Sequence, residues 1–315
     1  MIDGVLHPAF ILLAGALLTG ITRGHLRSAV LFIAPVATLW ALWQIPDGVV
    51  ATAYFLGYDI QPIEGSAVRR LFATIFTIMA FTGGLFAFRQ AKWYELASAQ
   101  AYAAGAVGVC FAGDLITLFL YWELMALFST VIVWCGGTPA ARQAGIRYAI
   151  MHLLGGVILK VGIEGVVVHT GSIDVQPMLA TNFDTWMILI GILINAAAPP
   201  VSAWLSDSYP ESSPTGSVFL SAFTTKTAVL ALILLFPGEP VLVGIGLFIA
   251  LETFTLAFYI LIASNRESAL AAEAGLKYLL LGAVATGFMA FGIALVYASS
   301  GTLALPDAVV RLVTE

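Results

Sequence analysis

Charge is scarce in this sequence of 315 residues, because Asp, Glu, Lys and Arg together make up 10% of it. Soluble domains carry about 25% charged residues, so this chain could not cover a water-facing surface. Apolar residues reach 60% and the mean hydropathy is +0.99. The composition therefore excludes a soluble protein and indicates an all-α, polytopic integral membrane protein.

This sequence lacks the residues that several other classes of protein require. A net charge of −5 excludes a nucleic-acid-binding protein. The two cysteines, Cys110 and Cys135, lie in or beside apolar stretches and allow neither a disulfide framework nor a metal site. Without a glycine-rich phosphate loop, HExxH or GxSxG, we expect no catalytic centre, metal or cofactor in the chain. The N-terminus, MIDGVLHPAF, has no basic region, so no cleavable signal peptide is expected.

Apolar runs separated by short polar links predict about ten membrane-spanning helices, because about 20 apolar residues cross a bilayer core. The expected spans are 5–22, 28–46, 70–88, 95–113, 115–135, 146–168, 183–199, 216–236, 241–263 and 276–298. Segment 47–69 is expected to be a loop, and WLSDSYPESSPTG (204–216) a turn-rich loop.

Basic residues are distributed unevenly over alternate links, and this asymmetry orients the chain. With the N-terminus outside, the inner links hold Arg23, Arg27, Arg89, Lys92, Arg142, Arg147, Arg266 and Lys277. The outer side then holds Arg69, Arg70 and Arg311. The bias predicts that both termini lie outside.

The seventh span contains an interruption at Asn195-Ala-Ala-Ala-Pro199-Pro200. Proline lacks the amide N–H and clashes with the preceding turn, so a regular helix cannot continue through it. Either the span ends at Pro199, or the helix is broken in the way that lines ion sites in transporters. Both interpretations are open at this point.

Ionisable residues inside the spans are the strongest functional signal, since each costs about 2.5–3.5 kcal/mol at a helix centre. They are Glu123, His152, Lys160, Glu164, Lys226 and Glu252. So many charges at mid-membrane favour proton transfer between Glu–Lys pairs over static ion pairs. Lys160 and Glu164, four residues apart, equally fit a pair that only neutralises itself. His152 fits either a relay or a packing role.

The second half of the chain repeats part of the first. At a shift of 130 residues, GIRYAIMHLLGGVILKVGIEGVVVHTGS matches GLKYLLLGAVATGFMAFGIALVYASSGT at several glycines, and Arg147 meets Lys277. At a shift of 129, Glu123 meets Glu252. Repeats of this kind are typical of transporters.

Three motifs carry a family resemblance: YWELMALFS, RYAIMHLLGG and PPVSAWLSDSYPESSPTGSVFLSAFTTKTAVLALILLF. Through them, residues 70–237 resemble the antiporter-like membrane subunits. These are the D-type subunit of Mrp-type cation/proton antiporters and the related proton-pumping subunits of respiratory complex I. Residues 247–303 look more like the fifth and sixth helices of complex I subunit N. The implied divisions are N-terminal helices (1–94), a five-helix antiporter-like unit (95–237), a second glutamate-helix and glycine-rich-helix copy (241–303) and a short tail (304–315).

The resemblance also implies roles for individual residues. The family's fifth-helix glutamate falls on Glu123, and on Glu252 in the second copy. Its eighth-helix lysine falls on Lys226, and the basic residue that begins subunit N's sixth helix falls on Lys277.

The family's seventh-helix lysine should precede AAAPP, where this sequence has Asn195. This departure removes the usual partner of the glutamate, and Lys160 on the neighbouring span is the candidate substitute. A second departure is that the family's second inverted five-helix unit is missing.

The implied function is a proton- or Na⁺/proton-translocating subunit of a multisubunit antiporter or complex I-like assembly in the bacterial inner membrane. Its partners would be other membrane subunits, the lipid bilayer, and H⁺ or Na⁺. Redox chemistry, as in a proton-translocating NADH-quinone oxidoreductase, would belong to partner chains. A transport-inactive scaffold or assembly subunit and a stand-alone secondary transporter are the alternatives.

Overall fold

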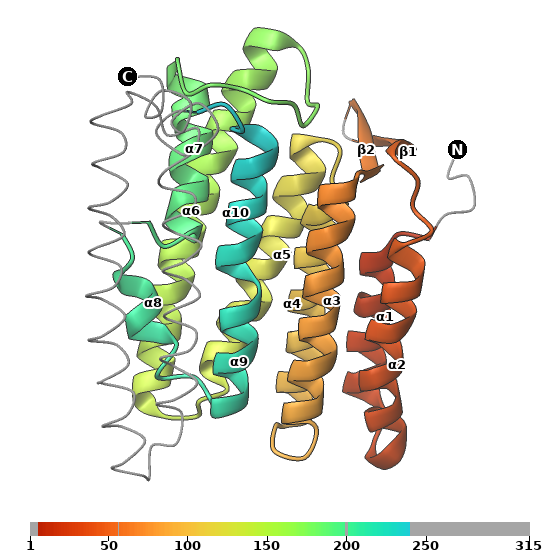
Figure 1. Cartoon of the computed structure of the whole chain (residues 1–315). Coiled ribbons are helices and arrows are strands. Elements are labelled where there is room, and N and C mark those ends of the chain that lie inside the picture. The colour runs from red at the N-terminus through yellow and green to blue at the C-terminus, as the bar shows by residue number, and fades with distance from the viewer. Residues whose placement is uncertain (1–5, 56, 199–200, 240–315) are drawn as a thin grey trace, which may run out of the picture.

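The computed structural model describes residues 6–55, 57–198 and 201–239, which form a bundle of roughly parallel and antiparallel helices with a hairpin at one end (Figure 1). The helices are α1 (Pro8–Ile21), α2 (Gly24–Leu42), α3 (Ala67–Ala87), α4 (Trp93–Phe111), α5 (Leu115–Trp134), α6 (Pro139–Thr170), α7 (Phe183–Asn195), α8 (Ala203–Ser208), α9 (Pro214–Ala222) and α10 (Thr224–Leu235). The strands are β1 (Gly48–Phe55) and β2 (Tyr58–Gly65).

Every expected span before residue 240 coincides with a helix or a pair of helices. In the described part of the chain, five segments are long and apolar enough to cross a membrane: α2, α3, α5, α6 and the α9–α10 pair. The expected spans 241–263 and 276–298 lie outside the described residues, so the count of ten stays a prediction.

Helix α6 is longer than the expected span 146–168. Its N-cap Thr138 accepts a hydrogen bond from the Ala141 amide, Pro139 occupies the first turn, and Gly171 ends the helix at φ 71°. The 32 residues extend over about 48 Å, more than the bilayer core of about 30 Å. The expected start was wrong because a helix that leaves the core continues as long as its backbone bonds are satisfied.

Segment 47–69 is not the loop that we expected from its charges. It forms the antiparallel β1–β2 hairpin and then enters α3 at Ala67. The hairpin is fastened to the bundle through Asp114, the N-cap of α5, whose Oδ2 accepts the Gln61 amide at 2.7 Å. Buried Arg69 pairs with Glu64 at 2.5 Å and donates to the Ala112 carbonyl at 2.6 Å. The β-branched and aromatic residues of β1 and the positive φ of Gly57 in the turn fit a hairpin locally, and these distant contacts fasten it to the bundle.

Helix α4 lies at the centre and packs against α1, α3, α5 and α10 (Figure 1). It is rich in alanine and glycine, and nearly all of its residues from Glu95 onward are buried. A Cβ at Gly108 would overlap the Tyr121 ring on α5, so this glycine allows the two helices to approach closely. Small residues at helix contacts are what membrane bundles require, since lipid gives little driving force for association.

Candidate functional site

Two helical segments are interrupted near the middle of the bundle, and the first lies between α7 and α8 (Figure 1). Helix α7 ends at Asn195, Ala197 takes the left-handed conformation at φ 57°, and α8 begins at Ala203. The Trp204 indole donates to the Ile194 carbonyl at 3.0 Å and satisfies one freed group of the helix end. Pro199 and Pro200 themselves lie outside the described residues. Within 204–216, the expected loop is wrong at its start, because residues to Ser208 are helical.

The second interruption, at Phe223 between α9 and α10, was not expected from the sequence (Figure 1). The buried Tyr209 hydroxyl donates to the Leu220 carbonyl at 2.7 Å. Burial raises the pKa of the Tyr209 phenol well above its ordinary value, so this group stays a neutral donor. The Lys226 ammonium donates to the Ser221 carbonyl. A cation at a helix C-terminus is favourable, since the last carbonyls carry partial negative charge.

On the α10 side of the same break, a residue of α4 provides the hydrogen-bond partner of the first backbone amide. The Thr224 amide donates to the Tyr102 hydroxyl at 2.9 Å, and the Thr224 hydroxyl shares a second hydrogen bond with it. The hydroxyls of Thr225 and Thr227 are buried and have no hydrogen-bond partner in the described part of the protein. The run Phe-Thr-Thr-Lys-Thr was the available signal, because threonine side chains compete with helical backbone bonds.

A small cavity lies where these two interruptions meet α5 and α6. Its volume is about 10 Å³, close to the minimum for one water molecule. Its lining comes from four helices and consists of Trp122, Met125, Ala126, His152, Asn195 and Thr224. The structure thus brings together two of the residues that the sequence singled out, His152 and Asn195.

Glu123 projects from the middle of α5 toward α6. Its Oε1 atom is buried, lacks a hydrogen-bond partner among the described residues, and lies against Gly156, where a Cβ would overlap it. None of the ion pairs found in this part of the protein includes Glu123. Its sequence neighbour Trp122 lines the cavity, whereas Glu123 itself is not among the lining residues.

His152 is 2% exposed, and its Nε2 atom has no hydrogen-bond partner in residues 6–239 as described. Its ring makes a tilted contact with Tyr148, at a centroid distance of 4.1 Å, and an edge-on contact with Trp204, at 4.7 Å. A buried polar atom without a partner is rare in native proteins and points to water or function. Both interpretations of His152, a relay member and a packing histidine, therefore stay predictions.

Asn195 ends α7 with 2% exposure, and its amide nitrogen donates to the Gly191 carbonyl at 3.3 Å. A Cβ at Gly155 would lie 3.0 Å from that nitrogen, so α6 and α7 are in close contact here. The amide supplies polarity to the cavity without a titratable proton.

Lys160 and Glu164 form an ion pair on α6 with 38% and 54% of their side chains exposed. The Lys160 ammonium also lies 5.7 Å from the centroid of the Phe119 ring on α5. Neither residue lines the cavity. Lys226 lies on α10 and does not line the cavity either, whereas Glu252 and Lys277 fall outside the described residues.

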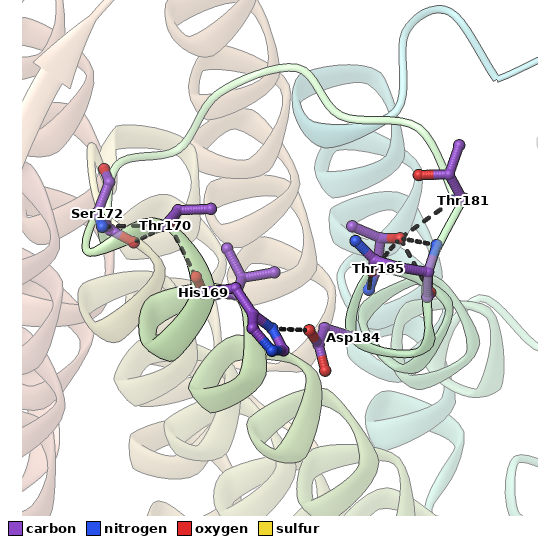
Figure 2. A network of polar contacts seen from close by, with 8 residues as sticks. His169, Thr170, Ser172, Thr181, Asp184 and Thr185 are labelled. Atoms are coloured by element: carbon purple, nitrogen blue, oxygen red, sulfur yellow. Dashed lines mark hydrogen bonds and ion pairs between the residues drawn. The ribbon is translucent and has the colours of Figure 1, made fainter.

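A polar network at the end of the bundle opposite α8 joins α6 to α7, and Figure 2 shows His169 and Asp184 pointing toward each other. The His169 Nδ1 and Asp184 Oδ2 atoms are 2.6 Å apart. Asn182 and Thr185 form a capping box at the start of α7. In the described part of the chain, no group of three or more His, Cys, Asp or Glu side chains could hold a metal ion.

Comparison with protein families gives one match. The family described as NADH:quinone oxidoreductase/Mrp antiporter, TM matches residues 112–241 and 244–312, which together make up more than half of the chain. The first stretch contains the residues of the cavity.

Individual relatives lead to the same family. Subunit N of the NADH-quinone oxidoreductase of Syntrophotalea carbinolica is 35% identical over 191 residues, which are 60% of this chain and 39% of the relative. The D-type subunit of the Na⁺/H⁺ antiporter of Alkalihalophilus pseudofirmus is 24% identical over 235 residues, 69% of this chain and 41% of the relative. The chain thus spans about two fifths of the length of these two curated relatives.

Among solved structures, a chain of the Mrp complex from Dietzia sp. DQ12-45-1b has the same fold. The TM-score is 0.67 at 21% sequence identity, and the match covers 88% of this chain and 61% of that chain. At this identity, the likeness concerns the fold alone.

Proposed function

This chain belongs to the NADH:quinone oxidoreductase/Mrp antiporter transmembrane family, and from that premise we propose that it is a proton- or Na⁺/proton-translocating membrane subunit. The observation that carries the proposal is the cavity that His152 lines at the two helix interruptions, together with two buried atoms that lack a partner among the described residues, His152 Nε2 and Glu123 Oε1. In membrane transporters, interrupted helices of this kind form the ion sites.

The proposed relay runs between Glu123 and His152. Glu123 lies against Gly156, which is one helical turn, about 6 Å, beyond His152 on α6. The cavity lined by His152 has room for about one water, and in this proposal that water bridges the Glu123 carboxyl and the His152 ring. A proton on the Glu123 carboxyl would pass through this water to Nε2 of the neutral His152 imidazole. Asn195 and the Thr224 hydroxyl would orient the water.

Two lysines supply positive charge in this proposal. Lys226 donates to the Ser221 carbonyl and forms no ion pair with a described carboxylate. Its proposed role is to stabilise an ionised Glu123. Lys160 is the proposed substitute for the lysine absent at Asn195. Its ammonium lies over Phe119, one turn from Glu123 on α5, while Glu164 holds it in place. Glu252 and Lys277, outside the described residues, are the proposed continuation of the relay.

We further propose that the N-terminus lies outside, in a bacterial inner membrane. One end of the bundle carries the α1–α2, α3–α4 and α5–α6 links (Figure 1). On or next to these links lie Arg23, Arg27, Arg89, Lys92, Arg142 and Arg147. Arg69 and Arg70 lie at the other end, beside the hairpin. The positive-inside bias supports an inward-facing position of the arginine-rich end.

Other membrane subunits are the proposed partners, because the relatives are named as subunits of an oxidoreductase and an antiporter. Mild detergent extraction and native mass measurement test this part of the proposal. We expect a hetero-oligomer. A monodisperse monomer that transports ions would instead support a stand-alone secondary transporter.

A transport-inactive scaffold is the second candidate function. It is favoured by Asn195, because an amide cannot take up the proton that a lysine at this position would exchange. Under this hypothesis, the cavity is a remnant of the family fold and the unpartnered groups stay static.

The deciding experiment measures proton flux of the assembled complex in proteoliposomes. Glu123→Gln keeps the side-chain shape and removes titration, so most of the flux should be lost. Asp59→Asn removes a carboxylate from the exposed hairpin and serves as the matched control with unchanged flux. Wild-type flux in Glu123→Gln would refute the relay, and absence of flux in the unaltered complex would support the scaffold.

A further inference from the structure

A second hollow lies at the link between α1 and α2, on the side of the bundle away from α6 and α7 (Figure 1). It is an open depression with a volume of about 720 Å³. Gly20, Ile21, Arg23, Arg27 and Trp93 line it. The transport proposal uses none of these residues.

Arg27 is held in one position by the end of α1. Its Nε and Nη2 atoms donate to the Thr22 carbonyl at 3.0 and 2.6 Å, and Nε also lies 3.1 Å from the Thr19 carbonyl. Nη1 has no hydrogen bond to any described residue. The guanidinium is therefore fixed, with one donor edge available to a ligand.

Arg23 adds a second cation at the start of α2. It is the exposed N-cap residue of that helix, and its side chain makes neither a cap nor an ion pair within the described ranges. Because α2 has no side-chain cap, its first amide groups and positive helix end also face the link. Three sources of positive potential thus converge on the hollow with no neutralising carboxylate in its lining.

The remaining wall is apolar and faces outward. Ile21 is 76% exposed, Trp93 is 48% exposed, and Leu17, one turn before Ile21 on α1, is 73% exposed. Ile21 and Leu17 continue from the hollow along the exposed side of α1, and Trp93 stands at the start of α4. A ligand that matches both parts needs an anionic head and a hydrocarbon tail.

We propose that this hollow binds an anionic phospholipid. Its headgroup phosphate would lie between Arg23 and Arg27, and an acyl chain would follow Ile21 and Leu17. Basic pockets between membrane helices recognise such headgroups, and arginine pairs with phosphate in bidentate geometry. A free phosphate would use the cations but not the apolar wall.

Native mass spectrometry of the purified complex, titrated with dioleoyl phosphatidylglycerol, tests the proposal. Arg23→Gln should weaken retention of this lipid about fivefold, the effect of losing one basic residue near an anionic headgroup. Arg23→Lys should keep most of the binding. Arg89→Gln is the control, because Arg89 is exposed on the α3–α4 link at the same end but does not line the hollow.

The competing outcomes separate the sources of the phosphate group. Dioleoyl phosphatidylcholine should bind more weakly than phosphatidylglycerol, and millimolar inorganic phosphate should not displace the lipid. Displacement by phosphate would indicate a free-anion site and overturn the lipid proposal. Equal loss in Arg23→Gln and Arg89→Gln would overturn it too, because the effect would then be general surface charge. Neither result bears on the flux measured for Glu123→Gln.

Discussion

Gly156→Ala tests the position of the Glu123 carboxylate. The added Cβ would overlap Glu123 Oε1 and lie 3.1 Å from the carboxyl carbon. Overfilling a packed contact costs about 1–3 kcal/mol, and the glutamate side chain is the group that can move. Displacement of a reacting group by about 1 Å can cost about 100-fold in rate, so we expect proton flux to fall at least tenfold.

The measurement pairs flux in proteoliposomes with thermal unfolding of the same preparation. Gly84→Ala on α3 is the control, because its Cβ would meet Leu31 at 3.4–3.7 Å, an ordinary contact. It should leave both quantities near the wild-type values. A second variant, Glu123→Asp, shortens the carboxylate by one methylene and makes room for the alanine.

The double variant Gly156→Ala with Glu123→Asp should therefore be more stable than the sum of the single effects predicts. A coupling free energy of about 0.5–3 kcal/mol is typical of residues in direct contact. Additive effects, or wild-type flux and stability in Gly156→Ala alone, would show that Glu123 does not lie against α6 as described.

Three further changes test other parts of the site. Lys160→Ala should lower proton flux, and adding Asn195→Lys should restore part of it; normal flux in Lys160→Ala would leave the lysine as the structural partner of Glu164. Tyr102→Phe removes the acceptor of the Thr224 amide, so the free energy of unfolding should fall by about 1–3 kcal/mol. An unchanged melting temperature would contradict that hydrogen bond. Asp114→Ala removes the α5 cap and the hairpin anchor, and it should destabilise the protein by about 1–2 kcal/mol and speed proteolysis of the hairpin.

The helices could be predicted from the sequence because bilayer thickness sets a length that apolar runs either reach or do not. The ends of α5 came within one residue of the expected span 115–135, since Asp114 caps its start and a short polar link follows it. The hairpin was not predicted, although Val49, Val50 and Gly57 carry local signals for it, whereas its attachment to α5 through Gln61 and Asp114, 53 residues apart, is a tertiary contact.

Of the two helix interruptions, one could be predicted from the sequence and the other depends on tertiary contacts. Pro199 and Pro200 predicted the first interruption, because proline has no backbone N–H to donate to a helical hydrogen bond. The second, at Phe223, contains neither proline nor glycine. It exists because Tyr102 and Tyr209, from other elements, satisfy the backbone groups that the break frees.

By itself, then, the sequence determined that the protein is an integral membrane protein of the antiporter-like family, and which charged residues lie inside its spans. Only the tertiary structure decided which of those residues meet. His152 and Asn195 line one cavity from two helices, Glu123 Oε1 lies against Gly156 on α6, and Lys160 pairs with Glu164 outside the cavity. The physical reason is that the partner of a buried charge depends on the rotation and spacing of packed helices. Glycines such as Gly155 and Gly156 set that spacing, and hydropathy along the chain does not report it.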